Sequence, residues 1–121
     1  MLTLDEFRVE METSRRLADE EGRALKDSQL ALERLYDLYL RFDSNERSMA
    51  NQVLQEWALS ENESVRFDAL ALIHRYKIVD AVPTLQTLAV RLASSSAPGA
   101  PYELRKVNRL LLSFGTVADR S

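Results

Sequence analysis

Apolar residues recur every three or four positions along most of the chain, and no segment alternates strictly between apolar and polar residues. This spacing is typical of amphipathic helices rather than of strands. Only three prolines and three glycines interrupt the pattern. The sequence therefore predicts an all-α protein.

The first third of the chain fits either one helix or two. Thr3 and Glu6 form a capping-box pattern, which predicts a helix that begins at Thr3 and continues to about Lys26. A second helix is expected to begin at residue 27 or 28. Its apolar face would contain Leu32, Leu35, Tyr36, Tyr39 and Phe42. Because apolar positions 4–42 keep nearly heptad spacing, one long helix over residues 3–42 is the alternative.

Four further helices are expected after residue 42. Asp43 and Glu46 repeat the capping pattern before a third helix, and the turn 60–63 has a capping-box pattern before a fourth, which continues to residue 76. Asp80 is expected to cap a fifth helix, with Pro83 in its first turn, where a missing N–H has no cost. An irregular loop over residues 94–101 precedes a sixth helix over about 102–114, which Gly115 ends.

The apolar positions also predict the core. On the third helix they are Met49, Val53, Leu54 and Trp57; on the fourth they are Val65, Ala69, Leu72, Ile73 and Tyr76. At 121 residues the chain has room for one domain, so we expect a single domain over residues 1–121. It would consist of an N-terminal helix over 1–26, helical hairpins over 27–114 and a frayed tail over 115–121.

Composition narrows the class of protein. Apolar residues make up 45% of the chain and charged residues 29%, which is ordinary for a globular protein. No run approaches the length of a membrane span, and the N-terminus lacks the features of a signal peptide, so we expect a cytoplasmic protein. The absence of cysteine excludes disulfides, thiol nucleophiles and thiolate metal sites.

Charge is divided unevenly along the chain. Residues 1–63 contain fifteen acidic and eight basic side chains, a net charge of −7, whereas residues 64–121 contain four and eight, a net charge of +4. Such asymmetry occurs in polar contact surfaces and head-to-tail assemblies, and also on ordinary solvated helices. Arg105, Lys106 and Arg109 could form a basic patch, but the net charge of −3 and the few aromatic residues argue against nucleic-acid binding.

A partial internal repeat leads to a family resemblance. A shift of 39 residues aligns Leu104-Arg105 with Val65-Arg66. The segment ENESVRFDALALIHRYKIVDAVPTLQTLA, residues 61–89, resembles the short bacterial HEAT-like repeat of the phycobilin-lyase type. The matching residues are Val65, Arg66, Ala69, Leu70, Leu72, Ala81, Val82, Pro83, Leu85 and Leu88. The glycine that this family usually has after the first helix of a repeat is absent, because the turn here is RYKIVD.

The resemblance implies an architecture and a mode of action. It implies an α-α superhelix of about three antiparallel hairpins with an N-terminal capping helix. Arg66 would be structural, reaching carboxylates and carbonyls in adjacent turns, and Arg105 would do the same in the next repeat. Trp57 and Pro83 would be structural as well. Partners would bind the concave face, which gives five candidate contact residues: Phe67, Leu70, His74, Arg105 and Arg109.

Catalytic chemistry has little support in the sequence. His74 is the sole histidine, and neither Leu70 nor Ile78, one turn away on either side, could orient it as a base. No Ser-His-Asp set, zinc spacing or glycine-rich phosphate loop is present. We therefore expect no enzymatic activity and no catalytic residue, cofactor or metal.

The sequence leaves three hypotheses of function. The first is a protein–protein interaction module of the HEAT-like type. The second is a stand-alone bacterial immunity protein that inhibits a basic toxin through the acidic first helix. The third is a self-associating structural protein, a homodimer paired through apolar positions 4–42, in which Phe7→Glu would yield a monomer.

Overall fold

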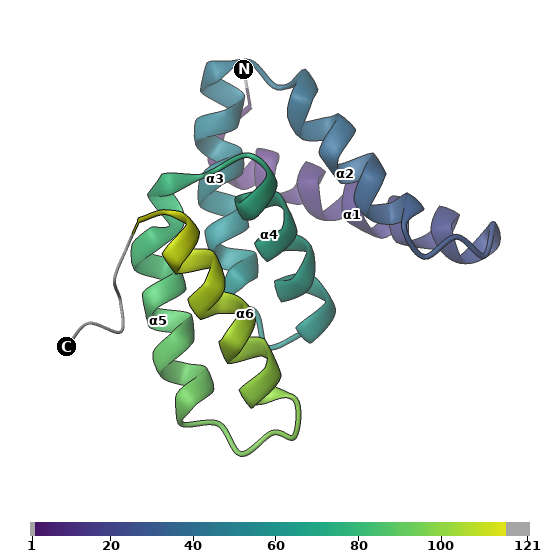
Figure 1. Cartoon of the computed structure of the whole chain (residues 1–121). Helices are drawn as coiled ribbons and strands as arrows, with labels where there is room; N and C mark the ends of the chain where they lie inside the picture. Colours follow the sequence, from purple (N-terminus) through teal and green to yellow (C-terminus); the bar gives the residue numbers. More distant parts are fainter. Residues whose placement is uncertain (1, 116–121) are drawn as a thin grey trace. The chain divides into compact units, whose positions relative to one another are not determined.

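The computed structural model describes residues 2–115, and all regular structure within that range is helical (Figure 1). The elements are α1 (Leu4–Ala24), α2 (Leu30–Arg41), α3 (Ser44–Ala58), α4 (Glu63–Arg75), the short 3₁₀ helix η1 (Val79–Ala81), α5 (Val82–Ala93) and α6 (Ala100–Ser113). The all-α class is confirmed. No helix in the described range is long and apolar enough to cross a membrane.

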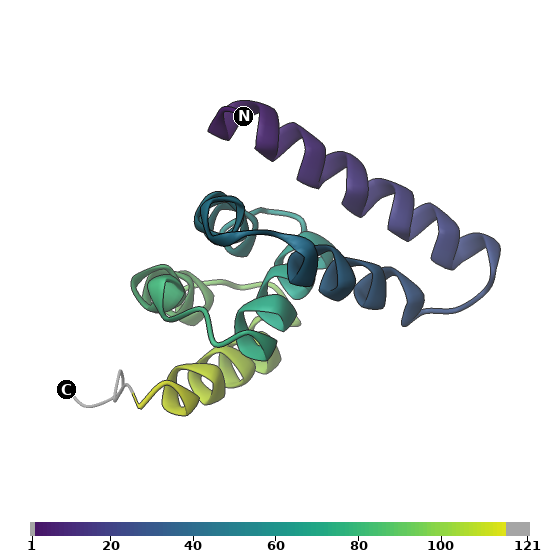
Figure 2. The same ribbon diagram turned by 90° about the horizontal axis from the view of Figure 1, so that it is seen from above.

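The chain divides into two compact units, residues 1–54 and residues 55–121, with the boundary inside α3. In the first unit, α1 and α2 form an antiparallel hairpin (Figure 2). Residues 25–29 connect the two helices, so the chain has two helices here rather than one. The first ends at Ala24, and two residues later Lys26 has a left-handed backbone with φ 54°. The N–H of Asp27 then bonds to the carbonyl of Gly22 at 2.9 Å, a Schellman ending.

The core of the first unit uses the apolar positions of both helices. Phe7, Met11 and Ala18 of α1 are buried, as are Leu35 and Tyr39 of α2. The rings of Phe7 and Phe42 lie 5.0 Å apart between centroids. These five apolar heptad positions are thus already buried within one chain.

Gly22 has a role that its sequence context did not reveal. It is buried in α1, and a Cβ atom there would lie 3.0 Å from the carbonyl oxygen of Asp27 and 3.6 Å from the nitrogen of Ala31. The contact is with backbone, which has little freedom to move in a tight turn. Gly22 thus allows the close approach of α1 to the start of α2.

Gly22→Ala is therefore expected to lower the free energy of unfolding by about 1 kcal/mol, because the backbone clash outweighs the gain in helix propensity. Gly99→Ala is the matched control, since its Cβ would meet only the flexible Glu63 side chain at 3.7 Å. The control should change stability by no more than about 0.5 kcal/mol. Urea unfolding of both variants measures the difference. A stability gain in Gly22→Ala would contradict the packing argument.

Two of the expected helix caps are confirmed. The Thr3 hydroxyl accepts from the N–H of Glu6, and the Glu6 carboxylate accepts from the N–H of Thr3 at 2.9 Å. Asp43 and Glu46 make the same reciprocal pair at 2.8 and 2.9 Å. Local side-chain chemistry thus specifies where α1 and α3 begin.

Two other caps differ from expectation. At α4 the cap is Asn62, whose Oδ1 accepts from the N–H groups of Ser64 and Val65, while Ser60 only orients the turn by accepting from the N–H of Asn62. Asp80 does not cap α5, because it lies inside η1 and α5 follows directly with no side-chain cap. The N-cap position of α5 is occupied by Ala81, so Asp80 lies one residue before it.

The second unit contains α4, α5 and α6, and α5 packs along α6 (Figure 1). Trp57, at the end of α3, is buried, as expected. On α4 the residues Ala69, Leu72 and Ile73 are buried as expected, whereas Val65 and Tyr76 are only partly buried. The remaining apolar positions of this core are Ala58, Leu70, Ile78, Ala81, Leu85, Leu88, Leu92, Ala100, Val107, Leu110 and Leu111.

Lys77 occupies the place of the glycine that the resemblance leads one to expect. Its φ is 51°, in the left-handed region that favours glycine. The N–H of Ile78 bonds to the carbonyl of Ile73 at 3.1 Å, and Ile78 is buried. The helix therefore ends in a Schellman motif although the sequence lacks glycine.

Lys77→Gly is expected to raise the free energy of unfolding by about 1 kcal/mol, because glycine has no steric cost at positive φ. Lys77→Ala is the control: it removes the same charge but keeps a Cβ, so its stability should remain within about 0.5 kcal/mol of the wild type. Thermal and urea unfolding would measure both. Equal stabilisation by glycine and alanine would attribute the effect to the lysine charge instead.

Candidate functional site

An ion pair between Arg66 of α4 and Glu103 of α6 joins two helices that are far apart in sequence. Arg66 Nε lies 2.7 Å from Glu103 Oε2, and Arg66 Nη2 lies 2.9 Å from Glu103 Oε1. Arg66 Nη1 also donates to the carbonyl of Ser60 at 3.0 Å. The arginine thus contacts a carboxylate and a carbonyl, the two kinds of group expected for it.

The pair is largely removed from solvent. The side chains of Arg66 and Glu103 are only 16% and 10% exposed. The hydrogen bonds that the charged guanidinium donates to the Glu103 carboxylate raise the pKa of Arg66. A bidentate geometry with both oxygens occupied is the form of ion pair in which attraction best offsets the loss of hydration. The pair therefore fixes the position of α6 relative to α4.

With α4 and α6 joined, aromatic and basic side chains meet on their outer surface. The Lys106 ammonium lies 4.7 Å from the ring centroid of Phe67 and 5.5 Å from that of Tyr102. The Arg105 guanidinium lies 5.9 Å from the Tyr102 centroid. These are cation–π distances. We call this surface, made of Phe67, Tyr102, Arg105, Lys106 and Arg109, the α4–α6 face.

The candidate contact residues do not all belong to this face. Phe67 is 49% exposed, and Arg105 and Arg109 are also exposed. His74 is exposed two turns further along α4. Leu70 is buried, so its proposal as a surface contact was wrong: it lies on the side of α4 that packs into the core.

Arg105 also differs from its expected role. It is exposed and lies over Tyr102 instead of being enclosed as Arg66 is. The physical reason is its position, because α6 is the last helix in the described part of the chain and no further described hairpin packs against its outer side. The buried charge on α6 is instead Glu103.

Tyr102 was not among the candidates from the sequence, although it is 62% exposed and contacts both Arg105 and Lys106. The available signal was spacing: Tyr102 and Lys106 are four residues apart on a helix and so share a face.

Of the residues expected to be structural, Pro83 lies in the first turn of α5, as predicted.

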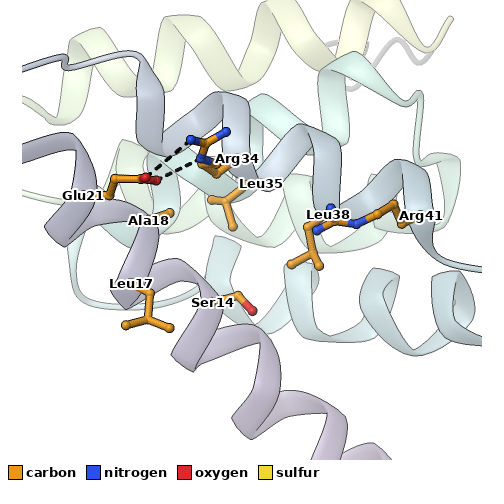
Figure 3. Close-up of a pocket in the computed structure, with 8 residues that line it drawn as sticks. All are labelled: Ser14, Leu17, Ala18, Glu21, Arg34, Leu35, Leu38 and Arg41. Carbon is orange, nitrogen blue, oxygen red and sulfur yellow. Dashed lines mark hydrogen bonds and ion pairs between the residues drawn. The ribbon is translucent and has the colours of Figure 1, made fainter. Parts of the chain in front are cut away.

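The first unit contains a groove of about 410 Å³ between α1 and α2 (Figure 3). Its apolar part consists of Leu17, Ala18, Leu35 and Leu38; Ser14, Glu21, Arg34 and Arg41 complete the lining. Arg34 Nε donates to Glu21 Oε1 at 2.9 Å across one end of the groove. This hydrogen bond lowers the pKa of Glu21. The groove thus has an apolar floor, and the Glu21 carboxylate at its edge is already paired with Arg34.

Within residues 2–115 no three acidic, histidine or cysteine side chains lie close enough together to hold a metal ion. Comparisons with protein-family models, curated proteins and solved structures yield no match to this chain.

The Arg66–Glu103 pair makes a testable prediction about stability. Arg66→Leu and Glu103→Leu should each lower the free energy of unfolding by about 3 kcal/mol, because each leaves its partner charged and poorly hydrated. The double variant should lose less than the sum of the two, with a coupling of about 2 kcal/mol.

The exposed pair Arg16–Glu20 on α1 serves as the control cycle, with an expected coupling of no more than about 0.5 kcal/mol. Chemical denaturation of the wild type, the two single variants and the double variant of each cycle supplies the couplings. Additive losses at Arg66 and Glu103 would show that the pair does not act as a unit.

Proposed function

We propose that this chain is a small, cytoplasmic, HEAT-like helical-repeat domain that binds a protein partner, and that the α4–α6 face is its contact surface. Phe67 and Tyr102 carry this proposal, because they are large, exposed and held in place by a shared lysine. Aromatic and arginine side chains are the residue types most enriched at protein interfaces.

Three features of the second unit support the HEAT-like assignment. Arg66 reaches a carboxylate 37 residues further along the chain, close to the 39-residue repeat seen in the sequence. Pro83 lies in the first turn of α5, and Lys77, in the turn where that family usually has a glycine, has the left-handed backbone that favours glycine. On this assignment the hairpins stack as repeats, and the whole chain is one interaction domain.

The chemistry of the face favours an acidic protein over a nucleic acid. Three cationic residues lie close together along α6: Arg105, Lys106 and Arg109. The acidic residue of this helix, Glu103, is buried against Arg66. Bases that bind single-stranded sites stack on open aromatic rings. Lys106 lies over both rings here, and the net charge of the chain is −3. A carboxylate on a partner fits this arrangement better than a phosphate backbone does.

The two other hypotheses have weaker support. Inhibition of a basic toxin by the acidic first helix would use its carboxylates, but three of these are already paired with arginines of α1: Asp5 with Arg8, Glu20 with Arg16 and Asp19 with Arg23. Dimerisation through heptad positions 4–42 would need Phe7 and its neighbours to leave their own hairpin core.

The test is affinity capture from lysate of the organism that encodes the protein, comparing wild type with Arg105→Glu/Arg109→Glu. The wild type should retain one stoichiometric protein with an acidic segment, and high salt should release it. The double variant should retain at least tenfold less. Arg16→Glu/Arg23→Glu makes the same change in net charge on α1 and should retain the partner. Equal capture by both double variants would contradict the assignment of the face.

A further inference from the structure

The outer side of α6 presents a regular stripe. Tyr102, Arg105, Arg109 and Leu112 follow at intervals of three, four and three residues, which places them on one side of the helix. All four are exposed, with Tyr102 at 62% and Leu112 at 57%. The stripe is about 15 Å long and has two arginines between two apolar ends.

The outer side of α2 presents the complementary stripe. Leu30, Glu33, Asp37 and Leu40 follow at the same intervals of three, four and three. Glu33 and Asp37 are exposed, Leu40 is 56% exposed and Leu30 is partly exposed. This stripe has two carboxylates between two leucines.

The other charges of α2 lie to the side of this stripe. Arg34 and Arg41 line the groove that faces α1, and Arg34 is bonded to Glu21 there (Figure 3). On α6 the neighbouring charge is Lys106, which is also a cation, because Glu103 is buried against Arg66. Each stripe therefore has one sign of charge at its centre.

We propose that the partner of the α4–α6 face is a second copy of this chain, whose α2 docks on α6. The inference rests on the proposed function, since it uses the same surface. Glu33 and Asp37 of one copy would lie opposite Arg105 and Arg109 of the other, with leucines packed at both ends. Because the 3-4-3 spacing reads the same from either end, the carboxylates lie opposite the arginines whether the two helices are parallel or antiparallel.

This contact joins different surfaces on the two copies, so it is heterologous. Repeated from copy to copy, such a contact generates a ring where the rotation closes and an open chain where it does not. One helix pair buries well under the roughly 1,200 Å² of a stable interface, so the association is weak, grows with concentration and is reduced by salt.

Sedimentation equilibrium tests the proposal on the full chain, from about 10 μM to about 1 mM at low and high salt, a range suited to weak association. The wild type should increase in mean mass with concentration at low salt. Glu33→Arg/Asp37→Arg and Arg105→Glu/Arg109→Glu should each weaken association at least tenfold, because each places like charges together. Circular dichroism would establish that both remain helical.

The decisive experiment tests whether exchanging the charges between the two stripes restores association. An equimolar mixture of the two reversed variants should associate again, and so should the variant with all four substitutions, because opposite charges face each other in both cases. Arg16→Glu/Arg23→Glu should associate as the wild type does. A wild type that stays monomeric, a reversed variant that associates normally, or a mixture that fails to associate would each overturn the proposal.

The same variants separate this inference from the proposed function. If the wild type is monomeric but Arg105→Glu/Arg109→Glu loses a captured acidic protein, the face binds a different partner and only the self-association fails. If neither sedimentation nor capture responds to that variant, the proposed function fails as well.

Discussion

The bonds from Arg66 to Glu103 are the interaction on which the second unit depends. Helix α5 packs on α6 through apolar side chains, which are tolerant of small shifts. The bidentate pair does not tolerate such shifts, because the guanidinium and the carboxylate must stay aligned to keep both hydrogen bonds. It therefore determines which residues of α4 and α6 lie together at the surface. The position of Lys106 over Phe67 follows from that alignment.

The first unit is organised by a different constraint, the close approach of backbone at Gly22. The absence of a side chain there lets Asp27 and Ala31 approach α1. The turn then reverses the chain, and Phe7, Met11, Leu35 and Tyr39 come together in the hairpin core. Each unit thus has one specific contact that orients helices whose apolar packing alone would permit several alignments.

Features that depend on neighbouring residues were predictable from the sequence, and features that depend on distant residues were less so. Helix type and the caps at Thr3 and Asp43 depend on residues within one turn, and these were predicted correctly. Whether residues 3–42 form one helix or two was undecided, because the break depends on Lys26 adopting a conformation that lysine rarely takes. The same limitation applies to Lys77, which completes a Schellman motif without glycine.

Longer-range features were predicted less well. The contacts of Arg66 matched the groups expected of it, but its carboxylate partner, Glu103, could not be identified from spacing alone. Leu70 was wrongly expected at the surface because it has helical spacing with Phe67 and His74, yet it is buried while those two residues are exposed. Tyr102 was missed because a residue at the start of a helix has no periodic context before it.

The central claim is that the Arg66–Glu103 pair holds Lys106 against Phe67 and so builds the α4–α6 face. Nuclear magnetic resonance of the Lys106 ε-methylene protons tests it directly, because an aromatic ring shifts protons above its plane upfield. The account predicts upfield shifts and nuclear Overhauser contacts to the Phe67 ring in the wild type. It also predicts their loss in a folded variant in which both members of the pair are leucine. Shifts typical of an unstructured lysine in the folded wild type would contradict it.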